Sequence, residues 1–540
     1  MTRQLAAFKS AGGWVLLASL TVVAGCAGPA ATSPATPLSE AAVCADWYHK
    51  LDAVTRQAGV SDGGARRLPG YPFLRSDRFL ASFGDEVADN TAAFGAWIGR
   101  LAELDRDARD AELSNMPLQF LPLLMTDDAA SKKRKQRIQT TTRVCARQAV
   151  RALLQSAPMA TAPGRRLLAA QAPVDDDYSE SKRALGLYPL TRVPFFAGVQ
   201  RWQQTTAEKF AAKAPPDATL VKRYSPASEP VPAAQIADAY ARRNPDALGV
   251  PSLSPPDTAL LLRAYAPEIH IETRGRYDRF GALQWGADSM LSDAFEASRP
   301  GSAQAPSVLV EQPVTYQRLA YTRYQGQTLL QLVYSVWFPE RPRVSGIDLL
   351  SGQLDSVVLR LTLAPDGTPW LYDSIHSCGC YHLFFPTPSA KALAPPSAGA
   401  ASVAEPIEWA FVPTTLPALM VGQRMTLHLE SGTHYVKGLR LVVEPPDGSP
   451  MPYALLDDAA LRTLSASGTL SGVTRSAFWP SGIVPGTERG ERLLFWPMGI
   501  ASPGAMRQWG RQPTAFVGRR HFDDARLLEL RFELDANRSN

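Results

Sequence analysis

The sequence predicts an α+β fold, in which a helical N-terminal part is followed by a mainly antiparallel β part. In the first third, apolar residues recur at steps of three and four, the period of an amphipathic helix: Phe94, Trp97, Ile98, Leu101 and Leu104. After about residue 260, runs of β-branched and aromatic residues between turn signals replace that period. We therefore expect a mainly helical region over residues 39–250 and a mainly β domain over residues 251–540.

Helical patterns surround two cysteines of the N-terminal part. Cys44 lies in one such segment, over residues 39–54, and Cys145 lies in another, over residues 137–154. Residues 157–181 mix Ala, Pro and Ser with three consecutive aspartates, which is typical of a loop or a domain boundary.

The first hairpin signal of the β part follows two apolar runs. Residues 327–338 and 354–363 have the composition of buried strands. Pro365-Asp366-Gly367 is a turn signal, and we expect residues 370–376 to return as the partner strand.

A second hairpin is expected where residues 425–430 and 433–443 flank Ser431-Gly432. Between the two hairpins, residues 386–405 are a low-complexity loop rich in Ala, Pro and Ser. Near the C-terminus, residues 527–534 are strand-like.

The first 26 residues have the pattern of a secretory signal, with Arg3 and Lys9 before an apolar run that is too short to span a bilayer. The run ends in Val23-Ala24-Gly25-Cys26, which resembles the lipobox of bacterial lipoproteins. The resemblance implies that residues 1–25 are a cleaved signal peptide and that Cys26 carries a lipid. The alternative is an ordinary cleaved signal that a cysteine happens to follow.

The residues after Cys26 extend this expectation. Ala27 stands where an aspartate would favour retention in the inner membrane, so the resemblance implies an anchor in the outer membrane, facing the periplasm. Residues 26–38 are small and Pro-rich and cannot bury apolar surface, so we expect a flexible tether between lipid and globule.

Charge and cysteine usage fit an exported protein. The net charge is +5, and removing Arg3 and Lys9 with a leader that holds no acid leaves +3, too small a bias to indicate nucleic acid as a partner. Without Cys26, four of the five cysteines remain. Cys44 and Cys145 are candidates for a disulfide in an oxidising compartment, and two buried thiols are the alternative.

The densest group of reactive side chains is a short segment with two histidines and two cysteines: His376, Cys378, Cys380 and His382. Thiolate and imidazole are ligands of zinc and copper, so a zinc or copper ion is one hypothesis. A second hypothesis is that Cys378 and Cys380, on either side of Gly379, form a strained, labile disulfide. A structural strand end with a tight turn at Gly379 is the third.

Three further histidines are candidates to join that group or to act alone. A two-residue turn at Ser431-Gly432 would pair His434 with Leu429 and place His428 and His434 on opposite faces. His521 follows two cations, Arg519 and Arg520, and precedes Asp523, which indicates an anion site or an acid–base pair. A surface turn is the alternative there.

These observations indicate a lipoprotein on the periplasmic face of the outer membrane, with a binding or assembly role in the cell envelope. Its partners would be the lipid bilayer and other envelope proteins or glycans. The alternative is a metal-dependent envelope hydrolase centred on the His376–His382 segment, and thiol–disulfide chemistry is a third hypothesis. No nucleophile elbow, phosphate loop or HExxH motif is present.

Overall fold

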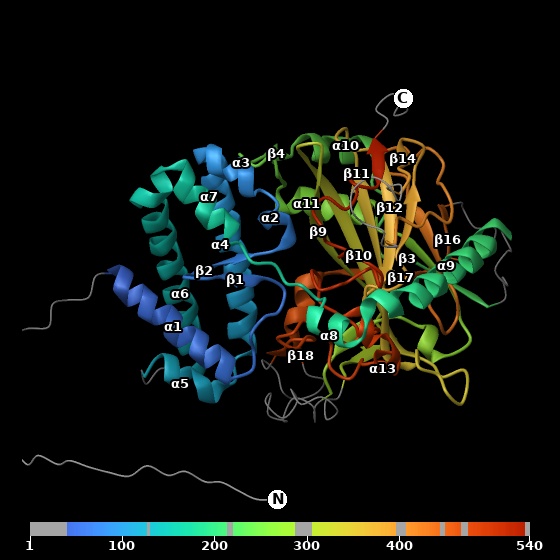
Figure 1. The fold of residues 1–540 in the computed structure, drawn as a ribbon, viewed down its shortest axis with the longest axis horizontal. Coiled ribbons are helices and arrows are strands. Elements are labelled where there is room, and N and C mark those ends of the chain that lie inside the picture. Colours follow the sequence, from blue (N-terminus) through green and yellow to red (C-terminus); the bar gives the residue numbers. More distant parts are fainter. Residues whose placement is uncertain are drawn as a thin grey trace, which may run out of the picture.

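A computed structural model describes residues 40–126, 130–212, 220–286, 305–395, 407–442, 449–465 and 474–534. The expected lipobox, Cys26 and the tether over residues 26–38 lie outside these ranges. The described chain has a helical N-terminal part beside a large sheet, as the sequence predicts (Figure 1). No helix within these ranges is long and apolar enough to cross a membrane.

The N-terminal part consists of helices packed around a short hairpin. The hairpin is β1 (Arg66–Leu68) and β2 (Tyr71–Ser76). The helices are α1 (Glu40–Gln57), α2 (Arg78–Ala81), α3 (Gly84–Asp89), α4 (Thr91–Asn115), α5 (Leu121–Leu124), α6 (Ser131–Leu154) and α7 (Ala162–Ala170).

Helix α4 confirms the periodic pattern that predicts it. The Asn90 side chain accepts hydrogen bonds from the backbone N–H groups of Ala92 and Ala93 and so caps the first turn. The side chains of Phe94, Trp97 and three other α4 residues are buried in one apolar core, and Leu104 packs against it. Helix α7 lies within residues 157–181, where we expected a loop, because Thr161 caps a helix with Pro163 in its first turn.

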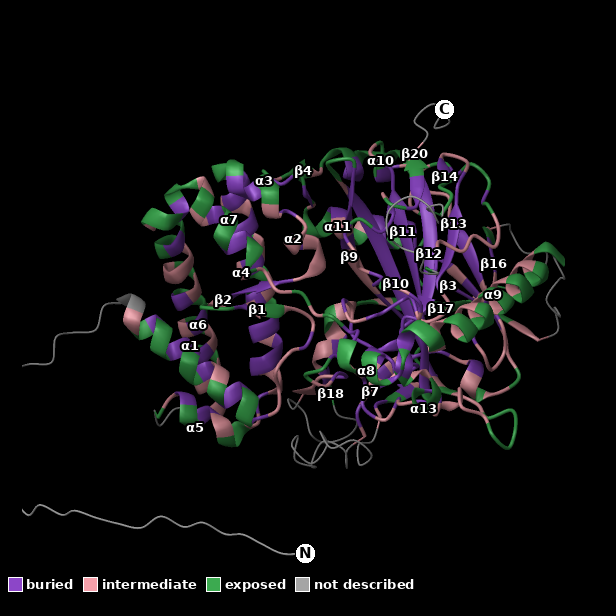
Figure 2. Cartoon of the chain, viewed as in Figure 1, coloured by how far each residue is buried: buried purple, intermediate pink, exposed green. Residues whose placement is uncertain are grey.

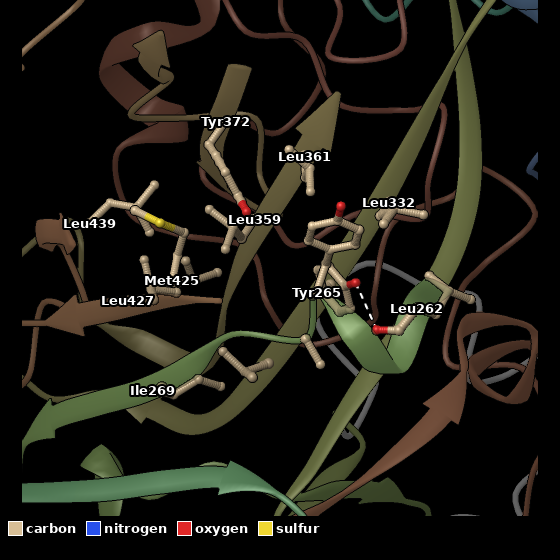
Figure 3. Packing of buried hydrophobic residues seen from close by; sticks show 14 of the residues in the cluster. Leu262, Tyr265, Ile269, Leu332, Leu359, Leu361, Tyr372, Met425, Leu427 and Leu439 are labelled. Carbon is tan, nitrogen blue, oxygen red and sulfur yellow. Dashed lines mark hydrogen bonds between the residues drawn. The ribbon is translucent and has the colours of Figure 1, made fainter. Parts of the chain in front are cut away.

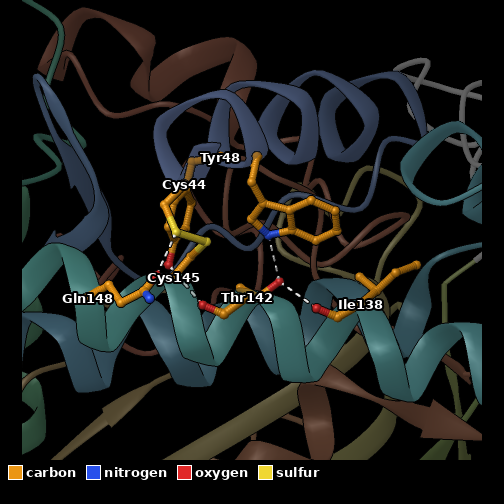
Figure 4. The surroundings of a disulfide bond; sticks show 7 residues. Cys44, Tyr48, Ile138, Thr142, Cys145 and Gln148 are labelled. Carbon is orange, nitrogen blue, oxygen red and sulfur yellow. Dashed lines mark hydrogen bonds between the residues drawn. A yellow bond between two sulfur atoms is a disulfide. The ribbon is translucent and has the colours of Figure 1, made fainter. Parts of the chain in front are cut away.

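A disulfide joins Cys44 of α1 to Cys145 of α6, with the two Cα atoms 5.1 Å apart (Figure 4). Next to it, the indole N–H of Trp47 donates to the Thr142 hydroxyl at 3.1 Å, so the helices are also held by a buried hydrogen bond. The bridge closes a loop across 101 residues. This is the pairing that the cysteine count made a candidate.

The β part is built on one ten-stranded sheet with both parallel and antiparallel neighbours. In spatial order its strands are β13 (Leu383–Pro386), β12 (Pro369–His376), β11 (Gly352–Leu363), β10 (Gln327–Arg341), β9 (Val314–Tyr324), β17 (Met451–Asp457), β3 (Val221–Pro226), β6 (Glu268–Glu272), β15 (Met425–Leu429) and β16 (Val436–Leu441). Six of the nine pairings are antiparallel, and β9–β17, β17–β3 and β6–β15 are parallel.

The remaining described elements cover this sheet or pair at its margins. The helices are α8 (Glu180–Leu185), α9 (Tyr188–Ala212), α10 (Ala233–Ala241), α11 (Pro255–Ala264) and α13 (Arg492–Phe495). Five two-stranded ladders complete the strands; the four in the β part are β4 (Asn244–Pro245) with β5 (Pro251–Ser252), β7 (Ala282–Gln284) with β8 (Ser307–Leu309), β14 (Ala390–Ala392) with β20 (Phe532–Leu534), and β18 (Leu464–Ser465) with β19 (Thr474–Arg475).

The sheet curls until its two ends approach each other. One continuous apolar core takes Tyr372 and Phe385 from β12 and β13, at one end of the strand order, and Leu427 and Leu439 from β15 and β16, at the other. Figure 3 shows Tyr372, Leu427 and Leu439 directed into this core. Figure 2 shows β10, β11 and β12 almost wholly buried, as their continuous apolar sequences predict.

Four expected boundaries need correction. Strand β3 already belongs to the large sheet, so the β part begins before residue 251. Residues Glu430 to Tyr435 form a longer turn than the expected two-residue turn, so Leu429 pairs with Val436 rather than His434. The described part of the 386–405 loop contains β14, and residues 396–406 lie outside the description. Of residues 527–534, only 532–534 form a strand.

Candidate functional site

Helix α9 roofs a groove at the place where the two ends of the sheet approach. The groove consists of two hollows that share Trp202 of α9, Tyr381 and Tyr435 as lining residues. The Trp202 and Tyr381 ring centroids are 5.4 Å apart, so these rings pack against each other where the two hollows adjoin. Within α9 only Tyr188 is buried, and the inner face of the helix supplies the roof.

The first hollow, here called the seam hollow, has a volume of about 300 Å³ and lies between the sheet ends. It is lined by apolar residues such as Phe210 and Leu383 and by three histidines, His270, His376 and His428. Charged side chains also line it: Lys209, Glu272, Glu430, Lys437 and Arg440. Burial lowers the pKa of His428 to about 4, so this imidazole is neutral at physiological pH.

The second hollow, here called the apolar hollow, has a volume of about 530 Å³. Its lining is dominated by Phe195, Val199, Phe495, Ile500 and Phe516, with Cys380 and Glu491 among the polar groups. Burial raises the pKa of Glu491 to about 7. This hollow therefore combines a large apolar surface with few polar groups, the composition of many small-molecule sites.

A buried carboxylate on β11 organises the floor of the groove. His376 of β12 pairs with Val357 of β11, and Asp355 lies two residues from Val357, on the same face of the sheet. The His376 Nδ1 atom donates to Asp355 Oδ1 at 3.1 Å. His376 Nε2, on the other side of the ring, is buried and has no hydrogen-bond partner. The imidazole therefore carries its proton on Nδ1 and a lone pair on Nε2.

His434 makes the second hydrogen bond to Asp355. Its Nδ1 lies 2.8 Å from Asp355 Oδ2, and its Nε2 lies 3.1 Å from the backbone carbonyl oxygen of Tyr277. Both partners can only accept, so both ring nitrogens must donate and His434 is an imidazolium cation. Its ring stacks on Phe338 with the centroids 3.9 Å apart.

The pKa values of this group follow from that pairing. Burial would raise the pKa of Asp355, but its interactions with His376 and His434 hold it well below its usual value. Burial lowers the pKa of His376, and the Asp355 carboxylate offsets this effect only in part. The site thus holds a carboxylate, an imidazolium that balances it, and a neutral imidazole.

Two tyrosines and an arginine enclose His376. Its ring makes edge contacts with Tyr381 and Tyr435, with centroid distances of 5.0 and 5.7 Å. Arg341 donates to the Tyr435 hydroxyl at 3.1 Å, and Tyr435 shares a hydrogen bond with Tyr381. In this row of hydrogen bonds, Arg341 donates its own proton to the Tyr435 oxygen. The two phenols hold two further protons, and only one of these lies between the two tyrosine oxygens. One phenol proton is therefore left to donate to a ligand.

The Cys378–Cys380 segment is a tight turn with two free thiols. Gly379 has φ 92°, and a Cβ there would lie 2.0 Å from the Pro513 carbonyl oxygen, so only glycine fits. The hydrogen bond that the Cys380 thiol donates to Cys378, together with burial, raises the pKa of Cys380 well above its usual value. Cys380 is therefore a thiol rather than a thiolate at neutral pH.

The four residues of the metal hypothesis do not converge on one centre. His376 bonds Asp355, whereas His382 Nε2 bonds Asp373 on the opposite face of β12 at 2.9 Å. Across the described ranges, no group of three or more His, Cys, Asp or Glu side chains is arranged to hold a metal ion. The histidines diverge because the turn at Gly379 places His382 at the start of the next strand, facing away from His376.

His382 belongs to a packed polar cluster. Asp373 accepts two hydrogen bonds from Arg360, and Arg360 also donates to the Phe522 carbonyl oxygen. Burial lowers the pKa of His382 to about 3, although its hydrogen bond to Asp373 opposes the shift. Every charge of this cluster is compensated inside the protein, as in a structural network.

The His521 segment is also engaged in internal contacts. Arg519 pairs with Asp176 and Glu180, and Asp523 pairs with Arg78 at 3.0 Å. Arg520 is buried and donates to the backbone carbonyl oxygens of Thr514, Glu408 and Trp409. Burial lowers the pKa of His521 to about 2. The two cations proposed for an anion site are thus used to hold the C-terminal segment in place.

Sequence reasoning missed Asp355, Tyr435 and helix α9. Asp355 resembles any charged residue at the start of a strand, and Tyr435 lies in a turn that we expected to be shorter. Trp202 could have been found, since it stands with Val199 and Thr206 on one face of a helical segment. Comparisons of the chain with protein-family models, curated proteins and solved structures found no match.

Proposed function

We propose that the protein is a lipid-anchored protein of the cell envelope that binds an amphiphile in the groove beneath α9. The observation that carries this proposal is the groove itself. An apolar hollow of about 530 Å³ meets, at Trp202, Tyr381 and Tyr435, a smaller hollow lined by histidines and charged groups. The two linings match the two ends of an amphiphile.

The anchor is supported by the leader sequence. Val23-Ala24-Gly25-Cys26 has the lipobox pattern, and the Pro-rich residues 26–38 suit a tether. A chain held on the periplasmic face of the outer membrane would meet lipids, lipid-linked glycans and acylated proteins. The apolar lining favours an acyl chain over a bare glycan as the group that is bound.

Binding is tested with a fluorescent fatty acid and two matched α9 variants. Val199→Glu places a carboxylate in the apolar hollow, and we expect it to raise the Kd of the probe at least ~10-fold, because an unpaired buried charge is costly. Val193→Glu makes the same change on the exposed face of the same helix and should leave the Kd unaltered. Equal affinities for the two variants, or a wild-type protein that does not bind the probe, would contradict the proposal.

Thiol–disulfide exchange is a second candidate that one observation favours. Cys378 and Cys380 are free thiols that share a hydrogen bond, and both line the apolar hollow. Oxidation by a disulfide reagent followed by thiol counting tests it. If Cys378→Ala and Cys380→Ala leave envelope function intact in cells, this candidate fails while the binding proposal stands.

A further inference from the structure

We infer that His376 is the general base of a hydrolytic site in the groove. Its substrate would be a carboxylic ester with its acyl chain in the apolar hollow and its polar alcohol part in the seam hollow. The inference rests on the proposed function, since the groove must first bind the amphiphile. It goes beyond binding by assigning a reaction and the atoms that carry it.

The first support is the orientation of His376. Asp355 holds Nδ1–H at 3.1 Å, which fixes the ring and leaves the lone pair of Nε2 on the side away from the carboxylate. Nε2 is buried and unpartnered, and His376 lines the seam hollow. Leaving this acceptor without a partner is costly, and a group bound in the seam hollow would supply one.

The second support is the charge of the surroundings. Asp355 stays ionised because His434 donates to its other oxygen at 2.8 Å. When His376 takes a proton, its positive charge forms next to a carboxylate that is already in place and fixed by a second hydrogen bond. Such preorganised stabilisation is strong where water is excluded, and all three side chains are buried.

The third support is a hydrogen-bond donor beside the base. The chain from Arg341 through Tyr435 to Tyr381 leaves one phenol proton unused, and both tyrosines border both hollows. A carbonyl group bound at the point where the hollows meet would lie beside this donor and beside His376. The phenol proton would stabilise the negative oxygen that forms as the carbonyl is attacked.

The position of this group also sets the orientation of the substrate. The α9 side chains over the apolar hollow run from Pro194 to Gln203, roughly 14 Å of helix, which suits a medium-length acyl chain. On the other side of Trp202, the seam hollow offers Arg440 to a polar or anionic alcohol part, while Lys437 and Lys209 lie beside Glu272 and Glu430. The ester bond between the two parts then lies near Tyr381 and His376.

The reaction balances with water as the second substrate. Nε2 of His376 takes a proton from a water molecule while the water oxygen bonds to the ester carbon. The tetrahedral intermediate then breaks its bond to the alcohol oxygen, and the His376 imidazolium returns the proton to that oxygen. The products are a carboxylic acid and an alcohol, and Asp355 retains the Nδ1 hydrogen bond throughout.

The test uses the full-length mature protein with dodecanoyl glycerol, and with dodecyl glycerol, an ether that cannot be hydrolysed. We expect wild type to release dodecanoic acid. His376→Ala should lose at least ~10²-fold in kcat and bind the ether as wild type does, because the general base acts on the chemical step.

Added imidazole should restore part of the His376→Ala rate, which a structural defect would not allow. His521→Gln, a buried histidine outside both hollows, is the control with unchanged rate.

Each outcome decides one claim. If wild type binds the ether but releases no acid, the hydrolytic inference is wrong and the binding proposal stands. If wild type binds neither compound, both are wrong. If His376→Ala hydrolyses the ester at the wild-type rate, another group is the base and the inference is overturned. Thermal unfolding of each variant shows whether it is folded in these assays.

Discussion

Asp355 and His376 lie on neighbouring strands of a buried sheet, and their side chains are joined by a hydrogen bond of 3.1 Å from Nδ1 to Oδ1. The same carboxylate binds His434 with its other oxygen, so one acidic group organises two histidines that are 58 residues apart in the sequence. The pair is therefore the point where β11, β12 and the turn before β16 are connected through polar contacts.

Asp355→Asn should lower the free energy of unfolding by about 3 kcal/mol or more. The amide cannot accept from both histidines, and it removes the nearer of the two carboxylates beside the buried His434. Urea unfolding measures the change. Asp110→Asn breaks an exposed pair with Arg143 and should cost less than about 1 kcal/mol. Equal losses of unfolding free energy in the two variants would show that the buried pair contributes no more to stability than the exposed pair.

Removing the disulfide should destabilise the helical part. In the chain-entropy model, a bridge across about 100 residues stabilises the folded state by about 4–5 kcal/mol. We expect the Cys44→Ala, Cys145→Ala double variant to lose several kcal/mol in urea unfolding, and wild type in reductant to lose a similar amount. Thiol labelling of the unreduced, denatured wild type should find Cys44 and Cys145 protected, and labelling of both would contradict the bridge.

Two glycines with positive φ allow the stability cost of backbone strain to be measured apart from the cost of steric crowding. Gly379 and Gly326 have φ of 92° and 77°, but a Cβ at Gly326 meets nothing within 4 Å, whereas one at Gly379 meets the Pro513 carbonyl oxygen. Gly326→Ala should cost about 1 kcal/mol of stability, the ordinary penalty for alanine at positive φ. Gly379→Ala should cost clearly more in the same urea titration. A cost no greater than that of Gly326→Ala would mean that the Pro513 segment moves away freely.

His382 should make the protein less stable in acid. Its pKa is about 3 in the folded state and about 6.5 when unfolded. Between these values the unfolded chain binds more protons, so stability is present above pH 6.5 and is lost as the pH falls through this window, with a limiting slope of about 1.4 kcal/mol per pH unit.

His382→Gln isolates this effect, because the amide still donates to Asp373 but does not titrate. The stability of the variant should fall less steeply than that of wild type between pH 6.5 and 4. Parallel curves for the two proteins would mean that protonation of His382 is not linked to unfolding.

Cys26→Ala should abolish lipid attachment and release the protein from the membrane, because the proposed anchor is a lipid on this cysteine. Fractionation of cells that express wild type or the variant measures this. Ala27→Ser is a control that keeps the cysteine. Continued sedimentation of Cys26→Ala with outer membranes would contradict the anchor.

Local patterns predicted the elements well. Strands β10 and β11 are continuous apolar runs because both of their faces are buried, and that composition is visible in the sequence. The apolar face of α4 is likewise visible in the sequence, as apolar residues that recur at steps of three and four. Both signals depend only on neighbouring residues, so they do not require knowledge of the tertiary fold.

The candidate site could not be predicted in the same way, because it depends on contacts between distant residues. The turn before β16 is long because Asp278 accepts hydrogen bonds from Ser431 and Gly432, about 150 residues later in the chain. That turn brings His434 to Asp355. The sequence showed His376 and His382 as neighbours, but alternation along β12 and the turn at Gly379 send them to different carboxylates.

Strand β17 has a consequence for the order in which the chain folds. Among the described strands it alone links β9 to β3, so it unites two halves of the large sheet. Every other strand of that sheet precedes residue 451 and leaves the ribosome first. The nascent chain therefore carries two open strand edges until its last sheet strand arrives, and these edges are sites of mispairing. A polypeptide that ends before Met451 should yield two half-sheets that aggregate rather than a smaller folded protein.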